Sequence, residues 1–345
     1  MTWKMPTRYH HIADMDSTAP RACKWCPKFS RYKLAILIIL ILSIIFISLS
    51  CLNYNFIHSA TLCLFSFRDG DNTSLSFNDH MHFHHAKRRL PQCLIIGARK
   101  AGTRALLQFI RLHPDVQGAS LEVHFFDRDS NYQLGYDWYR HQMPYSFKDQ
   151  ITIEKSPAYF TESVAPERVY VMNSSVRLLL IVRDPVERTI SDYAQLLDNK
   201  IKRHKTMQPF EKLVLVPDTG EINKSYIAVK RSIYHRHLLK WLHFFPLKQI
   251  HIIDGDNLRL RPWDEIYKVE SYLGLEHKIG KERFVFNTTR GVYCTLTEEG
   301  EERCLAHGKG RKHPNISTVV MHKLRAFFRP YNEKFFRIIK RRFQW

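Results

Sequence analysis

The sequence predicts an α/β fold in which helices cover both faces of a parallel sheet. Short apolar runs of strand length recur along the chain, at 94–96, 151–154, 178–182 and 249–253. Such runs are typical of parallel strands that are buried on both faces. Amphipathic helical patterns lie between them, for example at Ile190, Tyr193, Ala194 and Leu197. Ligands of such sheets bind beyond the carboxyl ends of the strands, so the residues that end each strand are the informative ones.

The N-terminal part predicts a membrane anchor. Residues 34–52 contain no charged side chain and are long enough, as a helix, to cross a hydrocarbon core of about 30 Å. Basic residues precede the span and place residues 1–33 in the cytosol by the positive-inside rule: Arg21, Lys24, Lys28, Arg31 and Lys33. A cleaved signal peptide is the alternative, but the preceding segment is too long for its n-region. We expect a single-pass type II protein.

Residues 53–90 predict a flexible stem, because they are polar and show no sustained period. The histidine cluster within 78–85 lacks the carboxylate or thiolate frame of a metal site, so we interpret it as part of the stem. In the cytosolic tail, Cys23 and Cys26 have no second cysteine pair, which favours palmitoylation over zinc binding. The functional domain is then residues 91–345.

The charge favours a polyanionic partner. The formal net charge is +20 at pH 7, and it stays strongly positive without residues 1–33, which contain seven Lys or Arg and two Asp or Glu. No zinc-finger spacing, basic zipper or RNA-binding aromatic motif appears, and the predicted anchor also argues against nucleic acid.

Sequons and cysteines agree with a lumenal domain. The Asn-x-Ser/Thr pattern predicts N-glycosylation at Asn72, Asn173, Asn223, Asn287 and Asn315. In an oxidising lumen we expect a disulfide between Cys294 and Cys304, which enclose a polar turn. Cys93 lies on the first strand of the domain, where we expect a buried free thiol.

Residues 93–104 predict a phosphate-binding loop. The order strand, glycine-containing loop, helix places backbone N–H groups around a phosphate. Gly97 and Gly102 keep the glycine spacing of the ATP-binding loop, but Thr103 occupies the lysine position and the lysine is Lys100, inside the loop. We therefore expect a phosphate-bearing donor rather than a nucleoside triphosphate with magnesium. A nucleotide kinase with Asp254 at a magnesium site is the weaker alternative.

Residues 178–193 predict a second strand that is followed directly by a helix. Asp184 and Pro185 specify a helix start, and Glu187 completes a capping box. Arg183 then projects into the crevice, and Ser191 follows Asp184 by two helical turns on the same face, with Gln195 one turn further. From this stretch alone, a cap beside an ordinary surface arginine is an equal alternative.

Taken together, these residues resemble the heparan sulfate glucosamine 3-O-sulfotransferases, which use 3′-phosphoadenosine 5′-phosphosulfate (PAPS). The matching segments occur in order, at 97–104, 122–127, 154–160, 182–193, 293–304 and 309–313. The resemblance covers Pro91 to the C-terminus. It implies a P-loop-like parallel sheet flanked by helices, in a single sulfotransferase domain of a type II Golgi membrane enzyme that acts on heparan sulfate.

The resemblance also implies the donor site. The 5′-phosphosulfate would contact Lys100, Ala101, Gly102, Thr103 and Arg104, and the 3′-phosphate would contact Arg183 and Ser191. Residues that would close over the donor are Tyr293, Lys309, Gly310, Arg311, Lys312 and His313. No metal is demanded, because the leaving group is a phosphate close to its ionised form. The family loop normally has two glycines after the lysine, and Ala101 replaces the first. Alanine would strain the loop if this position required a positive φ, and would be harmless in a helical conformation.

A base must take the proton of the acceptor hydroxyl, and Glu122 is the candidate. In an extended segment His124 faces the same way and can orient the base or the sugar, and Asp127 can support the site from the next turn. The same three residues could instead bind a metal, although no further ligand of matching type is evident. With Lys100, they form the predicted catalytic set. By resemblance, contacts to the acidic glycan fall on Arg99, Lys155, Gln195 and Arg311.

The sequence thus predicts transfer of a sulfuryl group from PAPS to the 3-hydroxyl of glucosamine in heparan sulfate. Two alternatives remain at this stage. One is another glycosaminoglycan sulfotransferase with a different oxygen or a nitrogen acceptor. The other is an inactive heparan-binding membrane protein, which Ala101 and the +20 charge would suit.

Overall fold

The computed structural model describes residues 41–42, 86–297, 300–305 and 314–345. The chain divides into two compact units, Met1–Met81 and His82–Trp345. The predicted tail, most of the predicted span and stem, and the sequon at Asn72 lie outside the described residues; Ile41 and Leu42 are helical. Within the described ranges, no helix has both the length and the apolar character needed to cross a membrane.

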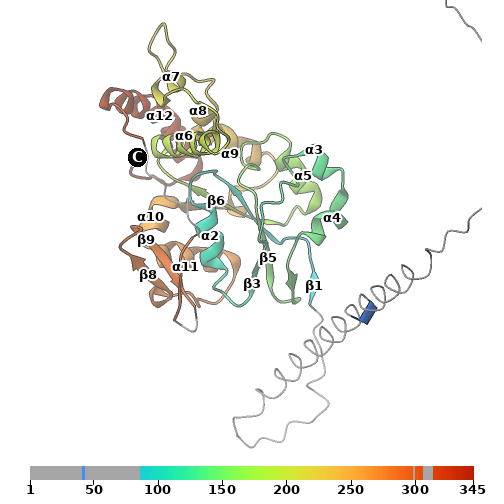
Figure 1. The fold of residues 1–345 in the computed structure, drawn as a ribbon. Coiled ribbons are helices and arrows are strands. Elements are labelled where there is room, and N and C mark those ends of the chain that lie inside the picture. Colours follow the sequence, from blue (N-terminus) through green and yellow to red (C-terminus); the bar gives the residue numbers. More distant parts are fainter. Residues whose placement is uncertain (1–40, 43–85, 298–299, 306–313) are drawn as a thin grey trace, which may run out of the picture. The chain divides into compact units, whose positions relative to one another are not determined.

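The centre of the second unit is a five-stranded parallel sheet (Figure 1). In spatial order its strands are β3 (Val116–Gly118), β5 (Ile151–Lys155), β2 (Cys93–Gly97), β6 (Arg177–Val182) and β7 (Ile250–Asp254). The four strands predicted from apolar runs are confirmed, and so is their parallel direction. Strand β3, at the edge, has only three residues and no apolar run to predict it. Cys93 is a buried free thiol, as predicted.

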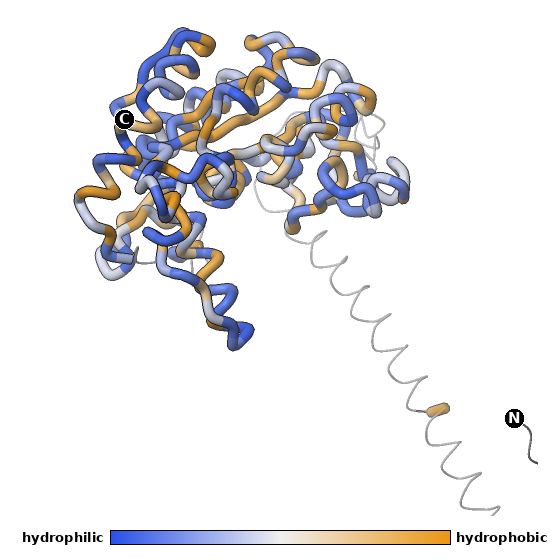
Figure 2. The backbone as a smooth tube through the Cα atoms, turned by 90° about the horizontal axis from the view of Figure 1, so that it is seen from above, coloured by the Kyte–Doolittle hydropathy of each residue, from blue (hydrophilic) through white to orange (hydrophobic). Residues whose placement is uncertain are grey.

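Helices cover both faces of the parallel sheet. Helix α2 (Thr103–Ile110) leads from β2 to β3 and packs against α11 (Pro262–Leu273). Helix α5 (Ala165–Met172) leads from β5 to β6, in the opposite direction across the sheet. Because such crossovers are right-handed, α2 and α5 lie on opposite faces. Hydrophobic residues follow the strands in Figure 2, and the strand interiors form one core with residues of α2, α9 (Tyr234–Leu242) and α11.

A second apolar cluster lies among four helices. They are α6 (Pro185–Ile201), α7 (Phe210–Val214), α8 (Ile227–Ser232) and α12 (Thr318–Ile339). Leu324 and Phe328 of α12 are fully buried there against α6 residues such as Ile190. This cluster stabilises α6, which also borders the site described below.

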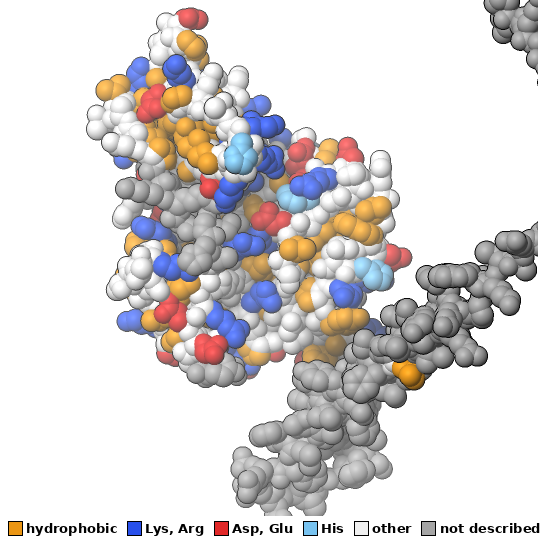
Figure 3. All heavy atoms as spheres, in the orientation of Figure 1, with side chains coloured by type: hydrophobic (Ala, Val, Ile, Leu, Met, Phe, Trp, Pro, Cys, Tyr) orange, Lys and Arg blue, Asp and Glu red, His pale blue; other side chains and the backbone are white. Residues whose placement is uncertain are grey.

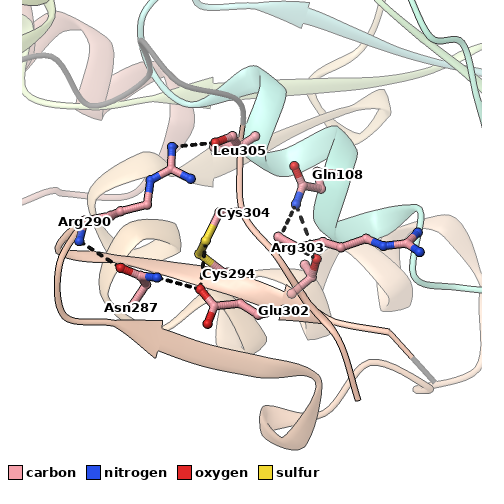
Figure 4. Close-up of a disulfide and its surroundings, with 9 residues drawn as sticks. Gln108, Asn287, Arg290, Cys294, Glu302, Arg303, Cys304 and Leu305 are labelled. Carbon is pink, nitrogen blue, oxygen red and sulfur yellow. Dashed lines mark hydrogen bonds between the residues drawn. A yellow bond between two sulfur atoms is a disulfide. The ribbon is translucent and has the colours of Figure 1, made fainter. Parts of the chain in front are cut away.

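A three-stranded antiparallel sheet follows the parallel one. It contains β8 (Phe284–Asn287), β9 (Val292–Leu296) and β10 (Glu302–Arg303). A disulfide joins Cys294 to Cys304, the pair expected from the sequence, with an S–S distance of 1.96 Å (Figure 4). Gln108 of α2 donates to the Arg303 carbonyl at 3.0 Å, so the antiparallel sheet is bonded directly to the helix after the glycine loop.

The remaining elements are short. Strands β1 (Lys87–Arg88) and β4 (Tyr145–Ser146) pair antiparallel. Helices α3 (Asp129–Tyr132) and α4 (Gly135–His141) precede β5, and α10 (Gly255–Leu260) follows β7. Two 3₁₀ turns cover Leu247–Gln249 and Lys281–Arg283.

Candidate functional site

A pocket of about 490 Å³ lies beyond the carboxyl ends of β2, β6 and β7, where the fold predicts a ligand. Its walls come from the glycine loop, α2, α6, α10 and β9, and from the segment around Glu122. Lys and Arg side chains are frequent on the face drawn in Figure 3, with fewer acidic ones among them. A hollow of this size and charge suits an anion as large as a nucleotide.

The glycine loop is fixed by its own backbone. The Ala98 N–H donates to the Ile181 carbonyl at 2.7 Å, and the Ala101 N–H donates to the Ala98 carbonyl at 3.0 Å. Lys100 and Gly102 have positive φ angles, 72° and 116°, and Ala101 does not. Alanine therefore does not strain the loop at position 101, because this position needs no left-handed backbone.

The turn after β7 lies directly against this loop. A Cβ at Gly255 would stand 2.4 Å from the Ala101 carbonyl oxygen and 2.8 Å from that of Val182. Only glycine permits this approach, which places α10 at the pocket wall. No local sequence pattern predicted this contact.

A buried charge cluster under the loop was also missed by sequence reasoning. Arg188 is fully buried and donates to the Arg99 carbonyl at 3.2 Å and to Asp192 Oδ2 at 3.0 Å. Arg99 Nε donates to Asp192 Oδ1 at 3.1 Å, and Arg231 donates to Oδ2 at 3.4 Å. Burial would raise the pKa of Asp192, but the three guanidinium groups together lower it. Arg188 and Asp192 lie within the matched segment 182–193, but the sequence assigned no role to either. Each stands three residues before a predicted site residue on α6, Arg188 before Ser191 and Asp192 before Gln195.

Arg183 lies at the end of β6 and lines the pocket, as predicted. Its Nη2 lies 3.5 Å from Asp256 Oδ1, and its carbonyl accepts from the Tyr234 hydroxyl at 2.9 Å. Asp184 caps α6 by accepting from the Val186 N–H at 2.8 Å, which confirms the predicted helix start. The Asp184 N–H, for which the sequence predicted Glu187 as acceptor, donates instead to Asp256 Oδ2 at 3.1 Å.

Glu122 and His124 line the pocket, and Asp127 contacts His124 from behind this lining. Asp127 Oδ2 lies 2.8 Å from His124 Nδ1, and Glu122 Oε2 lies 3.6 Å from His124 Nε2. The two carboxylates therefore contact opposite nitrogens of one ring, and they do not converge on a single point as metal ligands must. This arrangement suits an orienting chain in which Asp127 positions His124 and His124 contacts Glu122.

Lys155 contacts the same carboxylate. Its ammonium donates to Glu122 Oε1, and only 3% of the residue is exposed. Lys155 does not line the pocket, so in this structure it acts on the site through Glu122. Its predicted contact with a glycan stays a prediction.

The backbone that carries His124 is supported from β5. The His124 N–H donates to the Ser156 hydroxyl at 3.0 Å, and that hydroxyl donates to Glu154 Oε1 at 2.6 Å. Burial raises the pKa of Glu154 to about 6, against the opposing effect of hydrogen bonds from Ser156 and the Val123 N–H. His124 itself has a positive φ of 54°, a conformation that this support must maintain.

The far end of the pocket is apolar. Tyr293 lines it, with Trp263 packed edge-on against the tyrosine ring at 5.4 Å. Other apolar residues that line the pocket are Ala105 and Phe109 of α2, Leu258 of α10, Val292 of β9, and Leu305. Such a surface suits a planar base.

Most of the predicted site residues come together in this pocket. Those that line it are Arg99, Lys100, Ala101, Gly102, Thr103, Arg104, Glu122, His124, Arg183, Ser191, Gln195 and Tyr293. Lys155 and Asp127 lie behind this lining and contact it. The segment Lys309 to His313, including Arg311, lies outside the described residues. Lining residues that the sequence did not indicate include Asn199, Asp256 and Arg259.

The described sequons differ in their surroundings. Asn173 and Asn315 are exposed. The Asn223 amide donates to the Leu213 carbonyl at 3.2 Å, and the Asn287 amide donates to Glu302 Oε1 at 2.7 Å (Figure 4). The first two are therefore the more accessible candidates for a glycan.

Comparisons with known proteins agree with this architecture. The family model of the sulfotransferase domain matches residues 90–343. Heparan sulfate glucosamine 3-O-sulfotransferase 5 of Mus musculus is 49% identical over 82% of this chain and 80% of its own length. The Homo sapiens protein of the same name is 48% identical over the same shares. A sulfotransferase structure from Alicyclobacillus acidocaldarius, 19% identical, superposes with a TM-score of 0.54 over 74% of this chain and 98% of that one, which supports the fold.

Proposed function

The chain belongs to the sulfotransferase domain family and, within it, to the heparan sulfate glucosamine 3-O-sulfotransferases, and from this premise we propose that it transfers a sulfuryl group from PAPS to the 3-hydroxyl of glucosamine units in heparan sulfate. The observation that carries the proposal is the pocket itself. It joins a phosphate-type loop, a strand-end arginine and a carboxylate with two orienting partners in one cavity.

The described residues fit a PAPS molecule. PAPS supplies a sulfuryl group attached to a phosphate that serves as the leaving group. Lys100 and the N–H groups at the start of α2 would neutralise the charge that builds on that phosphate. Arg183 and Ser191 would bind the 3′-phosphate, and the apolar end around Tyr293 would take the adenine. The buried Arg183 Nε supports this assignment, because it has no hydrogen-bond partner among the described residues.

Glu122 would accept the proton of the acceptor hydroxyl. Its carboxylate contacts the Lys155 ammonium on one oxygen and faces His124 on the other, so its direction is fixed before a sugar arrives. Asp127 in turn fixes the His124 ring. Because the carboxylate side chain remains 40% exposed at the pocket mouth, a hydroxyl can reach it.

The polyanionic acceptor would be drawn by the basic surface. Arg99 and Gln195 line the pocket from the glycine loop and from α6, and both are within the predicted glycan set. Arg99 is already oriented by Asp192, so little conformational entropy is lost when its guanidinium binds a sulfate or carboxylate. Arg311 belongs to the same predicted set and lies outside the described residues.

We further propose that residues 34–52 anchor the protein in the Golgi membrane as a single-pass type II protein with glycans on its lumenal domain. The uncharged span and the basic residues before it support this. Protease treatment of sealed Golgi vesicles should leave the domain intact unless detergent is added. Peptide N-glycosidase should increase its mobility on gels. Digestion of the domain in sealed vesicles would contradict the orientation.

The enzymatic proposal is tested by incubating the purified protein with labelled PAPS and defined heparan oligosaccharides, followed by disaccharide mapping. We expect label on the glucosamine 3-oxygen. Label on another oxygen or on the nitrogen would assign the enzyme to a different acceptor. If PAPS binds but no sulfuryl group is transferred to any oligosaccharide, the enzymatic proposal is wrong and the alternative of an inactive glycan-binding protein remains.

A further inference from the structure

Arg183 and Asp256 face each other across the ends of two neighbouring strands, and both line the pocket. Their Nη2 and Oδ1 atoms lie 3.5 Å apart. Asp256 is also fixed by its second oxygen, which accepts from the Asp184 N–H at 3.1 Å. The close contact of Gly255 with the Ala101 carbonyl fixes the backbone just before it. The carboxylate therefore has a defined place between the glycine loop and the start of α6.

An acidic group at this place is unexpected in a pocket for a multiply charged anion. Of the described side chains that line the pocket, two are carboxylates, Glu122 and Asp256. Glu122 has the role of base in the proposed reaction, and Asp256 has no role in it. The Asp256 side chain remains 36% exposed, and each of its oxygens can accept more than the one partner it has.

Arg183, which lies beside Asp256, can donate further hydrogen bonds. The Arg183 side chain is 20% exposed, and its Nε is buried without a hydrogen-bond partner in the described part of the chain. An acceptor group must satisfy this nitrogen in the working protein. In the proposed function that acceptor is the 3′-phosphate. The neighbouring ribose carbon carries the 2′-hydroxyl, so a phosphate on Arg183 brings that hydroxyl toward the arginine's acidic partner.

We infer that Asp256 accepts a hydrogen bond from the ribose 2′-hydroxyl of the donor and makes the pocket selective for a 3′-phosphate beside a free 2′-hydroxyl. The inference rests on the proposed function. A carboxylate accepts from a hydroxyl in a strong, charge-assisted bond. The same charge repels a phosphate on the 2′-oxygen, which makes the discrimination two-sided. Carboxylates bind the ribose 2′-hydroxyl in a comparable way in dinucleotide-binding folds.

The first test needs only the unmodified protein. Calorimetry would compare adenosine 3′,5′-bisphosphate, its 2′-deoxy analogue and adenosine 2′,5′-bisphosphate. We expect the 2′-deoxy analogue to bind about tenfold more weakly, the effect of losing a hydrogen bond to a charged group. We expect the 2′,5′ isomer to bind weaker still, by about a hundredfold, because its phosphate meets the carboxylate.

The second test uses Asp256→Asn. The amide oxygen can still accept from the Asp184 N–H, so α6 should keep its start, and thermal unfolding would verify this. We expect the penalty for the 2′-deoxy analogue to fall to about twofold and the 2′,5′ isomer to gain about tenfold, because the charge is absent. Asp264→Asn is the matched control. Asp264, on α11, is similarly exposed and pairs with Arg261. All three ligands should bind this variant as they bind the unmodified protein.

The outcomes separate this inference from the proposed function. Equal binding of the 2′-deoxy analogue and the parent bisphosphate to the unmodified protein would overturn the inference. So would an equal loss for all three ligands in Asp256→Asn, which would make Asp256 a positioning residue for Arg183 alone. If the unmodified protein binds none of the bisphosphates, the proposed donor site itself is wrong.

Discussion

The two ends of the pocket are constructed differently. At the donor end, the glycine loop and the strand-end arginine are fixed by backbone hydrogen bonds, by close packing at Gly255 and by the buried Arg188–Asp192 ion pair of α6. At the acceptor end, the carboxylate of Glu122, the proposed base, contacts Lys155 at the end of β5 and faces His124, which in turn contacts Asp127. Glu122, His124 and Asp127 lie on a segment without regular secondary structure. The donor end therefore gains its precision from the fold, whereas single side chains determine the acceptor end.

Among the changes that test this difference between the two ends, Glu122→Gln should have the largest effect, a loss of turnover. Removal of a base lowers turnover by about 10² to 10⁴-fold. Because no donor-end contact changes, affinity for adenosine 3′,5′-bisphosphate should stay within about twofold. Rapid-mix turnover with labelled PAPS and calorimetry would measure the two quantities.

Glu276→Gln is the control for this change, since Glu276 is exposed and pairs with Lys278 outside the pocket. It should alter neither quantity. Turnover that survives in Glu122→Gln would remove Glu122 from the base role. A parallel loss of donor affinity would show that the two ends are not independent.

The second effect concerns stability at the donor end. Arg188 and Asp192 form a fully buried pair four residues apart on α6, and Lys202 and Asp198 form an exposed pair with the same spacing on the C-terminal side. Breaking a buried pair costs about 3–5 kcal/mol of unfolding free energy, because an unpaired charge remains inside. The cost should lie at the lower limit here, since Arg99 and Arg231 still contact Asp192.

Denaturant unfolding of Arg188→Met and Lys202→Ala would measure this difference. We expect a loss of about 3 kcal/mol for the first and at most about 0.5 kcal/mol for the second. Arg188→Met should also weaken donor binding, because it removes the hydrogen bond to the Arg99 carbonyl. Equal stability of the two variants would mean that the buried cluster contributes nothing beyond its exposed counterpart.

This difference also explains what the sequence could predict. The strands, the helix start at Asp184 and the glycine loop follow from local patterns, because each depends on residues near one another in the chain. Arg188, Asp192 and Asp256 were missed, because the contacts that tie them to the site, to Arg99 and to Asp184, join residues far apart in the chain. Ala101 could not be judged either. Its φ depends on how β6 and α10 pack around the loop, and the structure had to provide it.

The third effect is a pH dependence that distinguishes the two ends. Burial raises the pKa of Glu154, beneath His124, from 4.5 to about 6 in the folded protein. The folded state thus favours its protonated form, and the corresponding stability is present below pH 4.5 and is lost as the pH rises through 6. The shift corresponds to about 2 kcal/mol. Asp192 has a lowered pKa, so its contribution has the opposite sign and is lost as the pH falls.

Unfolding curves of the unmodified protein and Glu154→Gln between pH 4.5 and 7.5 would reveal this contribution. The stability of the unmodified protein relative to the variant should fall by about 2 kcal/mol across that range. Glu276→Gln should give curves parallel to those of the unmodified protein. If the curve of Glu154→Gln is also parallel to that of the unmodified protein, the carboxyl group of Glu154 has the same pKa in the folded and unfolded states.

The smallest effect separates two neighbouring positions of the donor loop. Ala101→Gly should cost about 0.5–1 kcal/mol of stability through the greater freedom of the unfolded chain, with donor affinity changed by less than about threefold. Gly102→Ala should cost about 1–2 kcal/mol, because Gly102 has a φ of 116° and alanine strains there. It should also weaken donor binding, since the strain falls at the start of α2, whose N–H groups would bind the phosphate in the proposed function. A large loss of donor affinity in Ala101→Gly would mean that the methyl group of Ala101, a residue that is only 3% exposed, contributes to the loop more than the backbone conformation does.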